Sequence, residues 1–446
     1  MPRSNAARTN ARCAAPDRRA EASESSAAAE FADRGAGVRR ALVHDFVRPR
    51  RPRIPAGFQP RKEHAALLTK RPTTPSPSPE HGRLRGASVV FLTFESLGMA
   101  QLAATPEDAR GSARTPFLDS LRDGAVTSAH HFCPAPLTNA AHLAWYAGRP
   151  VAFAGPWSLA ALGQAGYRTA YLTAAIAGHY GLLRILQAAG FAHVIDGPVL
   201  RHGRPDRGPA LDQELLTSGL PVLRTQVGGG PLFLHVHAAN THIPYRIAEP
   251  QRFRRHDAAS DRGRFLNGVE ETDAFFAALW RALQQLLQER GETQPPLLLI
   301  SSDHGQSFGE SGYFSHGSAV SDEQLRVPLL LHHPLLGPRR VRFSTHYDVL
   351  PTVLDLLGVP GPPGLGESLF HPGRRAGHLL WDGQPSRRTS NCLGLLFDEH
   401  KYALDLIRDT CIESDWNDRQ PRVLHQDERL YFEALLGQLS HHQGIQ

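Results

Sequence analysis

The chain has 446 residues, a formal net charge of +6 and a pI near 9.3. Apolar residues make up 41% of it, which allows a sizeable buried core and excludes a wholly disordered protein. No apolar run reaches the ~18–20 residues that a transmembrane helix needs, and the N-terminus lacks the apolar stretch of a secretory signal peptide. We therefore expect no membrane span and take the cytoplasm as the default compartment.

The positive charge is concentrated near the N-terminus. Residues 1–87 hold 18 Lys and Arg residues against 8 Asp and Glu residues, and they are rich in Ala, Arg, Pro and Ser. Such a composition cannot bury enough apolar surface to offset its ordering entropy, so we expect a disordered tail with a short helix near residues 37–47. A basic tail can bind an anionic membrane or nucleic acid. We favour a solvated tail, leave peripheral membrane contact open, and expect no nucleic acid partner.

Order is expected from Ser88 onward. The run 89–94 (VVFLTF) is continuously apolar and typical of a strand buried on both faces of a parallel sheet. Further strands are predicted at residues 167–173, 231–236, 297–300 and 327–331. Helices are predicted at residues 115–123, 142–147, 182–189, 269–289 and 348–357. This alternation predicts an α/β fold with a mainly parallel central sheet, helices on both faces, and functional groups at the carboxyl ends of strands.

Polar side chains follow three of the predicted buried strands. Glu95 follows the first, His242 lies in the loop after the strand that ends near residue 236, and Asp303 and His304 come just after residue 300. Two carboxylates and an imidazole can form a mixed oxygen and nitrogen metal site. Such a site suits zinc or manganese better than calcium, which prefers oxygen ligands alone.

Thr138 opens a predicted helix, in an N-cap-like position. A hydroxyl on a metal ion becomes a nucleophile at neutral pH, and a helix N-terminus beneath it favours an anion. Taken alone, Thr138 could be a helix cap, Glu95 a strand-end carboxylate, and Asp303 a loop residue held by backbone hydrogen bonds. Among 24 histidines, neither His242 nor His316 carries much weight by itself. The case for a site therefore depends on order and spacing.

The segments around these residues resemble the alkaline phosphatase/sulfatase superfamily. Residues 138–149 (TNAAHLAWYAGR) resemble the sulfatase signature CxPSRxxxxTGR, with Thr138 at the position of the modified cysteine. Residues 302–317 (SDHGQSFGESGYFSHG) form the most specific match. Five further segments match in the expected order, at residues 89–97, 115–125, 165–169, 240–245 and 346–358. The resemblance implies an alkaline phosphatase-like three-layer fold.

Departures from the signature indicate a branch of the superfamily. A formylglycine sulfatase needs Cys or Ser where Thr138 stands, and it usually has Arg where His142 stands. Glu95, a Thr nucleophile and the Asp-His-Gly spacing resemble instead the phosphoethanolamine transferases and lipoteichoic acid synthases. Those enzymes carry an N-terminal transmembrane domain that this sequence lacks, so a water-soluble substrate is as compatible as a lipid donor.

Carried over by position, the resemblance implies one zinc or manganese ion with four ligands: Glu95, Thr138, Asp303 and His304. It also places two histidines at the transferred phosphoryl group or its leaving group: His242 and His316. We therefore predict a metal-dependent hydrolase or transferase acting on a small-molecule or lipid-headgroup phosphate ester through a covalent phosphothreonine. The alternatives are a sulfate ester hydrolase without formylglycine and an inactive binding relative. The catalytic domain is expected at residues 88–370, completed or flanked by residues 371–446.

Overall fold

The computed structural model describes residues 51–69, 72–102, 111–150, 157–202, 210–372, 377–382 and 391–445. The short helix expected near residues 37–47 lies outside these ranges. Among the described helices, none is long and apolar enough to cross a bilayer.

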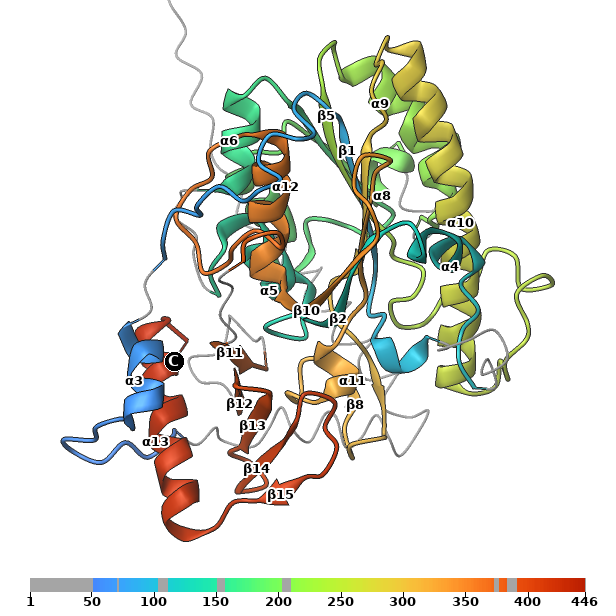
Figure 1. Cartoon of the computed structure of the whole chain (residues 1–446). Helices are drawn as coiled ribbons and strands as arrows, with labels where there is room; N and C mark the ends of the chain where they lie inside the picture. The colour runs from blue at the N-terminus through green and yellow to red at the C-terminus, as the bar shows by residue number, and fades with distance from the viewer. Residues whose placement is uncertain are drawn as a thin grey trace, which may run out of the picture. The chain divides into compact units, whose positions relative to one another are not determined.

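Eight strands form a central sheet in the order β10-β2-β9-β6-β1-β5-β3-β4. Their bounds are β1 (Val89–Phe94), β2 (Val126–Phe132), β3 (Arg168–Thr173), β4 (His193–Ile195), β5 (Leu232–His237), β6 (Leu297–Ser302), β9 (Leu329–His332) and β10 (Arg339–Thr345). Strand β9 runs antiparallel to both of its neighbours, and every other pairing in this sheet is parallel. The sheet is therefore mixed but mostly parallel (Figure 1).

Alternation along β1 divides the core into two layers. Val89 and Phe91 face one layer, while Val90 and Leu92 face the other, because successive side chains of a strand point to opposite faces. Both faces are fully buried, as the unbroken apolar run predicts. The first face is covered by four helices: α5 (Thr138–Ala147), α6 (Ser158–Gln164), α7 (Leu182–Ala189) and α12 (Val349–Leu357). The second face is covered by α4 (Pro116–Arg122), α8 (Gly197–Leu200), α9 (Leu220–Gln226) and α10 (Asp261–Glu289).

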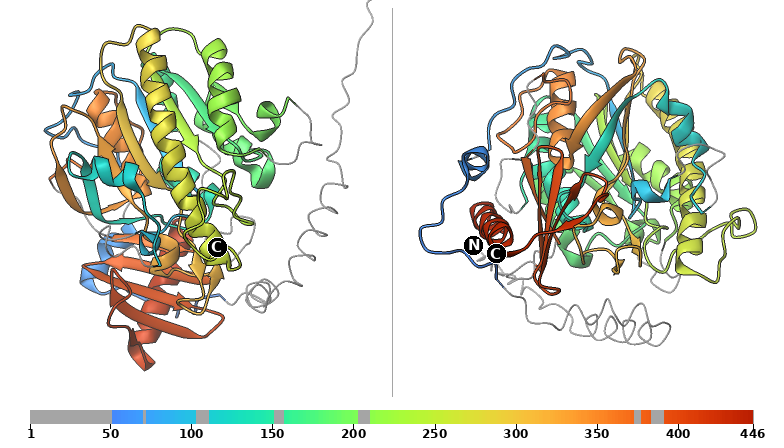
Figure 2. Two further views of the ribbon diagram at one scale, coloured as in Figure 1. Left: turned by 90° about the vertical axis from the view of Figure 1, so that its right-hand side faces the viewer. Right: turned by 60° about the horizontal axis from the view of Figure 1, so that its bottom comes forward.

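Figures 1 and 2 show these helices on opposite sides of the sheet, which confirms the predicted three-layer α/β arrangement. Short elements connect the layers: η1 (Met99–Gln101), η2 (His179–Gly181), η4 (Leu215–Gly219), β7 (Ser307–Phe308), β8 (Phe314–Ser315), α11 (Asp322–Leu325) and η5 (His346–Asp348).

The C-terminal residues form a second, antiparallel sheet. Its strands are, in order, β11 (Gly377–Trp381), β12 (Cys392–Phe397), β13 (His400–Asp405), β14 (Thr410–Asp415) and β15 (Arg422–Val423), followed by α13 (Gln426–His442). One face packs on α13, where Leu395 meets Leu435. The other face places Leu396 against Phe132 of β2 and Phe343 of the edge strand β10. This small sheet thus lies between α13 and the large sheet.

The disorder expected throughout residues 1–87 is wrong for residues 51–69 and 72–87. Residues 62–69 form helix α3 (Lys62–Thr69), and the His64 ring hydrogen-bonds the Tyr431 hydroxyl at 2.7 Å. Leu84 is buried in the core of the large sheet. Composition misled here because a polar, proline-rich segment needs no core of its own when it packs on one that other segments build.

Candidate metal centre

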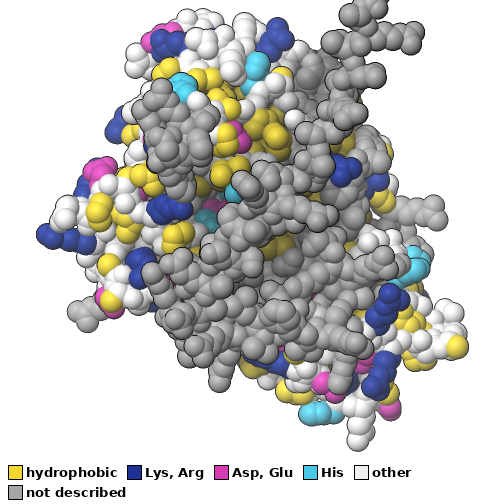
Figure 3. Space-filling view, turned by 180° about the vertical axis from the view of Figure 1, so that it is seen from behind, with side chains coloured by type: hydrophobic (Ala, Val, Ile, Leu, Met, Phe, Trp, Pro, Cys, Tyr) yellow, Lys and Arg dark blue, Asp and Glu magenta, His cyan; other side chains and the backbone are white. Residues whose placement is uncertain are grey.

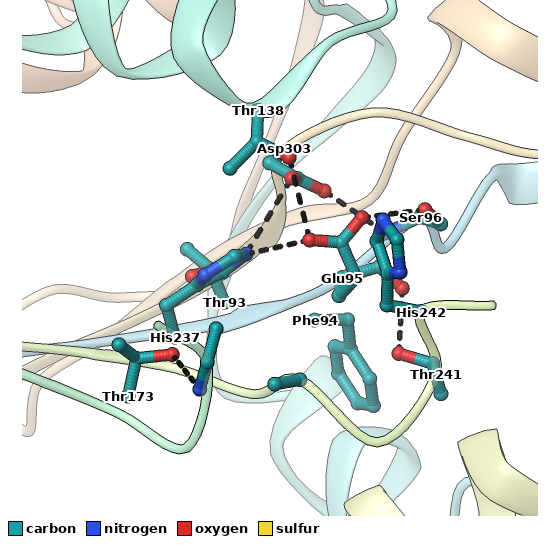
Figure 4. A network of polar contacts seen from close by, with 12 residues as sticks. Thr93, Phe94, Glu95, Ser96, Thr138, Thr173, His237, Thr241, His242 and Asp303 are labelled. Atoms are coloured by element: carbon teal, nitrogen blue, oxygen red, sulfur yellow. Dashed lines mark hydrogen bonds and ion pairs between the residues drawn. The ribbon is translucent and has the colours of Figure 1, made fainter. Parts of the chain in front are cut away.

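The parallel strands β1, β5 and β6 have their carboxyl ends on the same side of the large sheet, and the polar residues at these ends lie close together. Thr93 of β1 lies opposite His237, the last residue of β5. Glu95 follows β1, and Asp303 follows β6, the other neighbour of β1. Helix α5 begins at Thr138 beside the same edge, so its first side chain points at these carboxylates (Figure 4).

Glu95, Asp303 and His304 bring potential ligand atoms within 4.8 Å of one another, and all three side chains are buried. His304 Nε2 lies 3.4 Å from Glu95 Oε1 and 3.4 Å from Asp303 Oδ2. Its Nδ1 is placed to donate a hydrogen bond to the Gly305 carbonyl at 3.0 Å. That bond selects the tautomer whose Nε2 lone pair faces the carboxylates, as in metal-binding histidines.

The two oxygens of Asp303 have different environments. Oδ1 accepts hydrogen bonds from the backbone N–H groups of Ser96 at 2.9 Å and His304 at 2.8 Å. Oδ2 is buried and has no hydrogen-bond partner among the described residues. Burial raises the pKa of this carboxyl, but His304 and His237 outweigh that effect and hold the pKa well below its usual range. Asp303 therefore offers a charged oxygen toward the centre of the site.

Glu95 is also ionised despite its burial. Burial and the nearby Asp303 raise its pKa, but the close contacts with His237 and His304 have a larger effect and lower the pKa to about 2. Two buried carboxylates so close together need positive charge, since an uncompensated buried anion is costly. A divalent cation would supply that charge in a compact form.

Thr138 was predicted to be the N-cap of a helix, but in the structure it is the first residue inside helix α5. Leu137 is the N-cap and makes no side-chain capping bond. The Thr138 hydroxyl is therefore not used as a cap and lies 3.4 Å from Glu95 Oε2 and 3.4 Å from His304 Nε2. The first N–H groups of α5 lack intrahelical acceptors, and a helix N-terminus of this kind favours an anion.

The separations among these atoms fit ligands that share one ion. Two ligands bound at about 2.1 Å with a tetrahedral angle lie about 3.4 Å apart. Hydrogen bonds involving charged partners are shorter, at about 2.7–2.9 Å. The 3.4 Å spacings that involve Thr138, Glu95 and His304, together with the unpartnered oxygen of Asp303, fit a metal ion with these four ligands.

His242 and His316 lie next to this group. The rings of His304 and His316 are 4.4 Å apart between centroids, and those of His242 and His316 are 5.8 Å apart. His316 Nδ1 contacts Gln306 Oε1 at 2.8 Å, and His242 Nδ1 contacts the Ile243 carbonyl at 2.9 Å. Burial, reinforced by His304 and His242, lowers the pKa of His316 to about 3. His242 is exposed.

His237 is a site residue that the sequence interpretation missed. Its Nε2 lies 3.3 Å from Glu95 Oε2 and 3.4 Å from Asp303 Oδ2. Burial alone lowers the pKa of this imidazole, but the contacts with Asp303 and Glu95 outweigh it and raise the pKa to about 10. The strand predicted from sequence ended at Val236, one residue before the observed end of β5. A histidine directly after an apolar strand is the sequence feature that could have identified His237 as a site residue.

Comparisons with known structures identify the fold as that of the alkaline phosphatase superfamily. The lipoteichoic acid synthase LtaP from Listeria monocytogenes superposes with a TM-score of 0.63 over 85% of this chain and 97% of its own, at 17% sequence identity. An alkaline phosphatase superfamily protein from Vibrio parahaemolyticus superposes with a TM-score of 0.62 over 86% of this chain and 97% of its own, at 18% identity. The phosphonate monoester hydrolase of Agrobacterium radiobacter superposes with a TM-score of 0.57 over 74% of this chain and 89% of its own, at 16% identity.

The profile of the sulfatase family matches residues 87–359, which is more than half of the chain. The chain therefore belongs to the sulfatase family, whose members are metal-dependent hydrolases and transferases. Two curated relatives match shorter segments. The uncharacterized sulfatase YidJ of Escherichia coli is 32% identical over 92 residues, 20% of this chain and 18% of its own. The extracellular sulfatase SULF-1 homolog of Drosophila melanogaster is 33% identical over 78 residues, 17% of this chain and 7% of its own.

Proposed function

We propose that this sulfatase-family chain acts on phosphate esters, with Thr138 as the nucleophile and a covalent phosphothreonine as the intermediate. The observation that carries the proposal is the Thr138 hydroxyl, 3.4 Å from both Glu95 and His304 at the start of α5. Threonine cannot become formylglycine, so the side chain acts as an alkoxide or not at all. The Glu95, Asp303 and His304 ligand set suits one Zn²⁺ or Mn²⁺ ion.

The first step is an in-line attack by Thr138 on phosphorus. A divalent ion held by Glu95, Asp303 and His304 would lower the pKa of the hydroxyl and offset charge on the phosphoryl oxygens. The Thr138 proton passes to solvent, and the bond from Oγ1 to phosphorus forms as the bond from phosphorus to the leaving oxygen breaks. His242, which is exposed and lies beside His316, donates a proton to the leaving alcohol.

The second step releases the phosphoryl group from Thr138. A water molecule or an acceptor hydroxyl attacks phosphorus, and the bond from phosphorus to Oγ1 breaks. Burial lowers the pKa of His316 to about 3, so the ring is neutral at pH 7, and Gln306 Oε1 lies against its Nδ1. Its Nε2 can then accept a hydrogen bond that orients the attacking group, whose proton passes to solvent. Water gives hydrolysis, and an alcohol gives transfer of the substituted phosphoryl group.

Sulfate ester hydrolysis is the second candidate, because the family profile and the curated relatives are sulfatases by name. The full chain, loaded with Mn²⁺ or Zn²⁺, should be assayed on an aryl phosphodiester, an aryl phosphomonoester and an aryl sulfate. We expect the phosphate esters to be cleaved faster than the sulfate. Faster cleavage of the sulfate ester would instead support the second candidate, and no turnover in the metal-loaded protein would support an inactive relative.

Replacement of Thr138 tests the nucleophile directly. Thr138→Ala should lower kcat by at least about 10³-fold, because the attacking group is lost, while Thr138→Ser should keep part of the activity. Thr225→Ala, on the exposed surface of α9, is the matched control and should leave kcat unchanged. Intact-mass analysis after a rapid quench should show a phosphoryl adduct on the wild-type protein but none on Thr138→Ala. Full activity of Thr138→Ala would exclude this mechanism.

A further inference from the structure

His237 lies at the candidate metal centre but is not among the four ligand positions that the family resemblance implies. It is the last residue of β5, and its side chain is only 2% exposed. Figure 4 shows its ring directed between Glu95 and Asp303. Nδ1 has no hydrogen-bond partner in the described part of the chain, so the ring connects to the centre through Nε2.

The contacts of Nε2 have the spacing of shared ligation. Nε2 is 3.3 Å from Glu95 Oε2 and 3.4 Å from Asp303 Oδ2, which matches the separations made by His304 and Thr138 in the same cluster. A hydrogen bond from an imidazole to a carboxylate would be about 0.5 Å shorter. Donor atoms about 2.1 Å from a common ion lie at the observed separation.

The position of the ring is fixed by its surroundings. His237 pairs with Thr93 of β1 on one side and with Thr173 of β3 on the other, so ladders on both sides hold its backbone. The ring meets His142 edge-on, with centroids 5.4 Å apart, and lies 6.4 Å from the Tyr171 ring. An imidazole held in this way needs little reorganisation to bind an ion.

We propose that His237 Nε2 is a further ligand of the ion held by Glu95, Thr138, Asp303 and His304. The inference rests on the metal centre proposed above. Two imidazoles in the ligand set strengthen the preference for zinc or manganese over calcium and magnesium, which favour oxygen ligands. The site would then hold its ion through residues just after β1 and β6, the last residue of β5 and the first residue of α5.

Electron spin-echo spectroscopy of the Mn²⁺-loaded full chain counts directly coordinated imidazole nitrogens without any assay of activity. We expect two such nitrogens in the wild-type protein and one in His237→Gln. Competition with a chelator should show that His237→Gln binds Zn²⁺ at least about 10-fold more weakly. His242→Gln, a nearby histidine without contact to the carboxylates, should keep both nitrogens and the wild-type affinity. Asp303→Ala should bind neither ion stoichiometrically.

A single coordinated nitrogen in the wild-type protein would overturn this inference, and that count does not depend on the folding of any variant. Wild-type affinity in a folded His237→Gln protein would overturn it as well, and would make His237 a hydrogen-bond donor to the carboxylates. Failure of the wild-type protein to bind either ion would remove the metal centre itself, and with it both proposals.

Discussion

At the scale of single residues, His142 connects the first turn of α5 to the sheet. Its Nδ1 lies 2.7 Å from the Thr138 carbonyl oxygen, and its Nε2 lies 2.9 Å from the Tyr171 hydroxyl. Burial, with a contribution from His237, lowers the pKa of His142 to about 3, so the ring is neutral. A neutral ring that donates from Nδ1 must accept at Nε2, so Tyr171 sets the tautomer that orients the Thr138 backbone.

Tyr171→Phe should therefore affect both stability and activity. Loss of the hydroxyl leaves His142 Nε2 buried without a partner, which costs about 1–3 kcal/mol of unfolding free energy. We expect kcat on an aryl phosphodiester to fall about 10-fold with little change in KM, because the Thr138 hydroxyl loses its fixed position. Urea unfolding and steady-state kinetics measure the two effects.

Tyr167→Phe provides the control for this prediction. In the wild-type protein the Tyr167 hydroxyl donates a hydrogen bond to the Ala87 carbonyl at 3.2 Å. This contact lies near the start of β1, away from the strand ends that form the site. The control variant should lose a comparable amount of stability and keep its kcat. Equal kcat values for wild type and Tyr171→Phe would show that the hydroxyl of Tyr171 serves stability alone.

At the scale of elements, α4 is anchored by a carboxyl group from α10. Thr115, the N-cap of α4, makes no side-chain capping bond. Asp273 instead accepts hydrogen bonds from the backbone N–H groups of Phe117 at 2.9 Å and Leu118 at 3.0 Å. Burial raises the pKa of Asp273 to about 7, because the two backbone donors do not fully offset the loss of hydration.

This pKa predicts a pH dependence of stability. The folded-state pKa of about 7 exceeds the ordinary value of 3.8, so the stabilising contribution of Asp273 is complete below about pH 4 and is lost as the pH rises through 7. Asp273→Asn, which stays neutral, should become more stable relative to wild type by about 2–3 kcal/mol between pH 5 and pH 7.5. Urea unfolding of both proteins at the two pH values, with the metal removed, tests this. Parallel pH profiles would contradict it.

At the scale of the whole molecule, the segment before β1 completes the C-terminal end of α12. The backbone N–H groups of Gly82 and Leu84 donate to the carbonyls of Asp355 and Leu356, each at 2.8 Å. The Ser78 backbone N–H donates to Asp355 Oδ1 at 3.1 Å. The contacts of Gly82 and Leu84 satisfy carbonyls at the helix end, which have no intrahelical partner, and the Ser78 contact holds the Asp355 side chain.

A protein that begins at residue 88 should therefore be less stable than one that begins at residue 51. The shorter protein loses the buried Leu84 side chain and the donors to α12, and burial of one leucine alone contributes about 2–3 kcal/mol. We expect a difference in unfolding free energy of about 3 kcal/mol or more from urea titrations. Leu84→Ala in the full chain isolates the packing contribution. Equal stability of the two truncated proteins would show that this segment only lies on the surface.

The described surface bears on the partners of the protein. On the face shown in Figure 3, Lys and Arg side chains of the described residues are scattered singly and do not gather into a patch. Binding of a polyanion depends on clustered positive charge. The expectation that the protein has no nucleic acid partner stays a prediction from sequence.

The sequence by itself determined the central elements of the fold and most of the candidate site. Buried parallel strands have unbroken apolar runs, so β1 was predicted with its observed bounds, and Glu95 and Asp303 were singled out because they follow such runs. The edge strand β10 (RRVRFST) was missed, because three of its first four residues are exposed arginines and only its last three are buried. Helix α10 begins at Asp261, eight residues before the predicted start, because its first turn is capped by Ser260 and not marked by apolar spacing.

Only the tertiary structure decided which polar groups meet. Register between β1 and β5 brings His237 to the carboxylates, and no local pattern encodes a pairing between strands so far apart in the chain. The packing of residues 72–87 on α12 likewise depends on a core made by other segments. The composition of a segment indicates how that segment behaves alone. The burial of Leu84, the meeting of His237 with the carboxylates and the hydrogen bonds to the α12 carbonyls depend on neighbours that only the folded chain supplies.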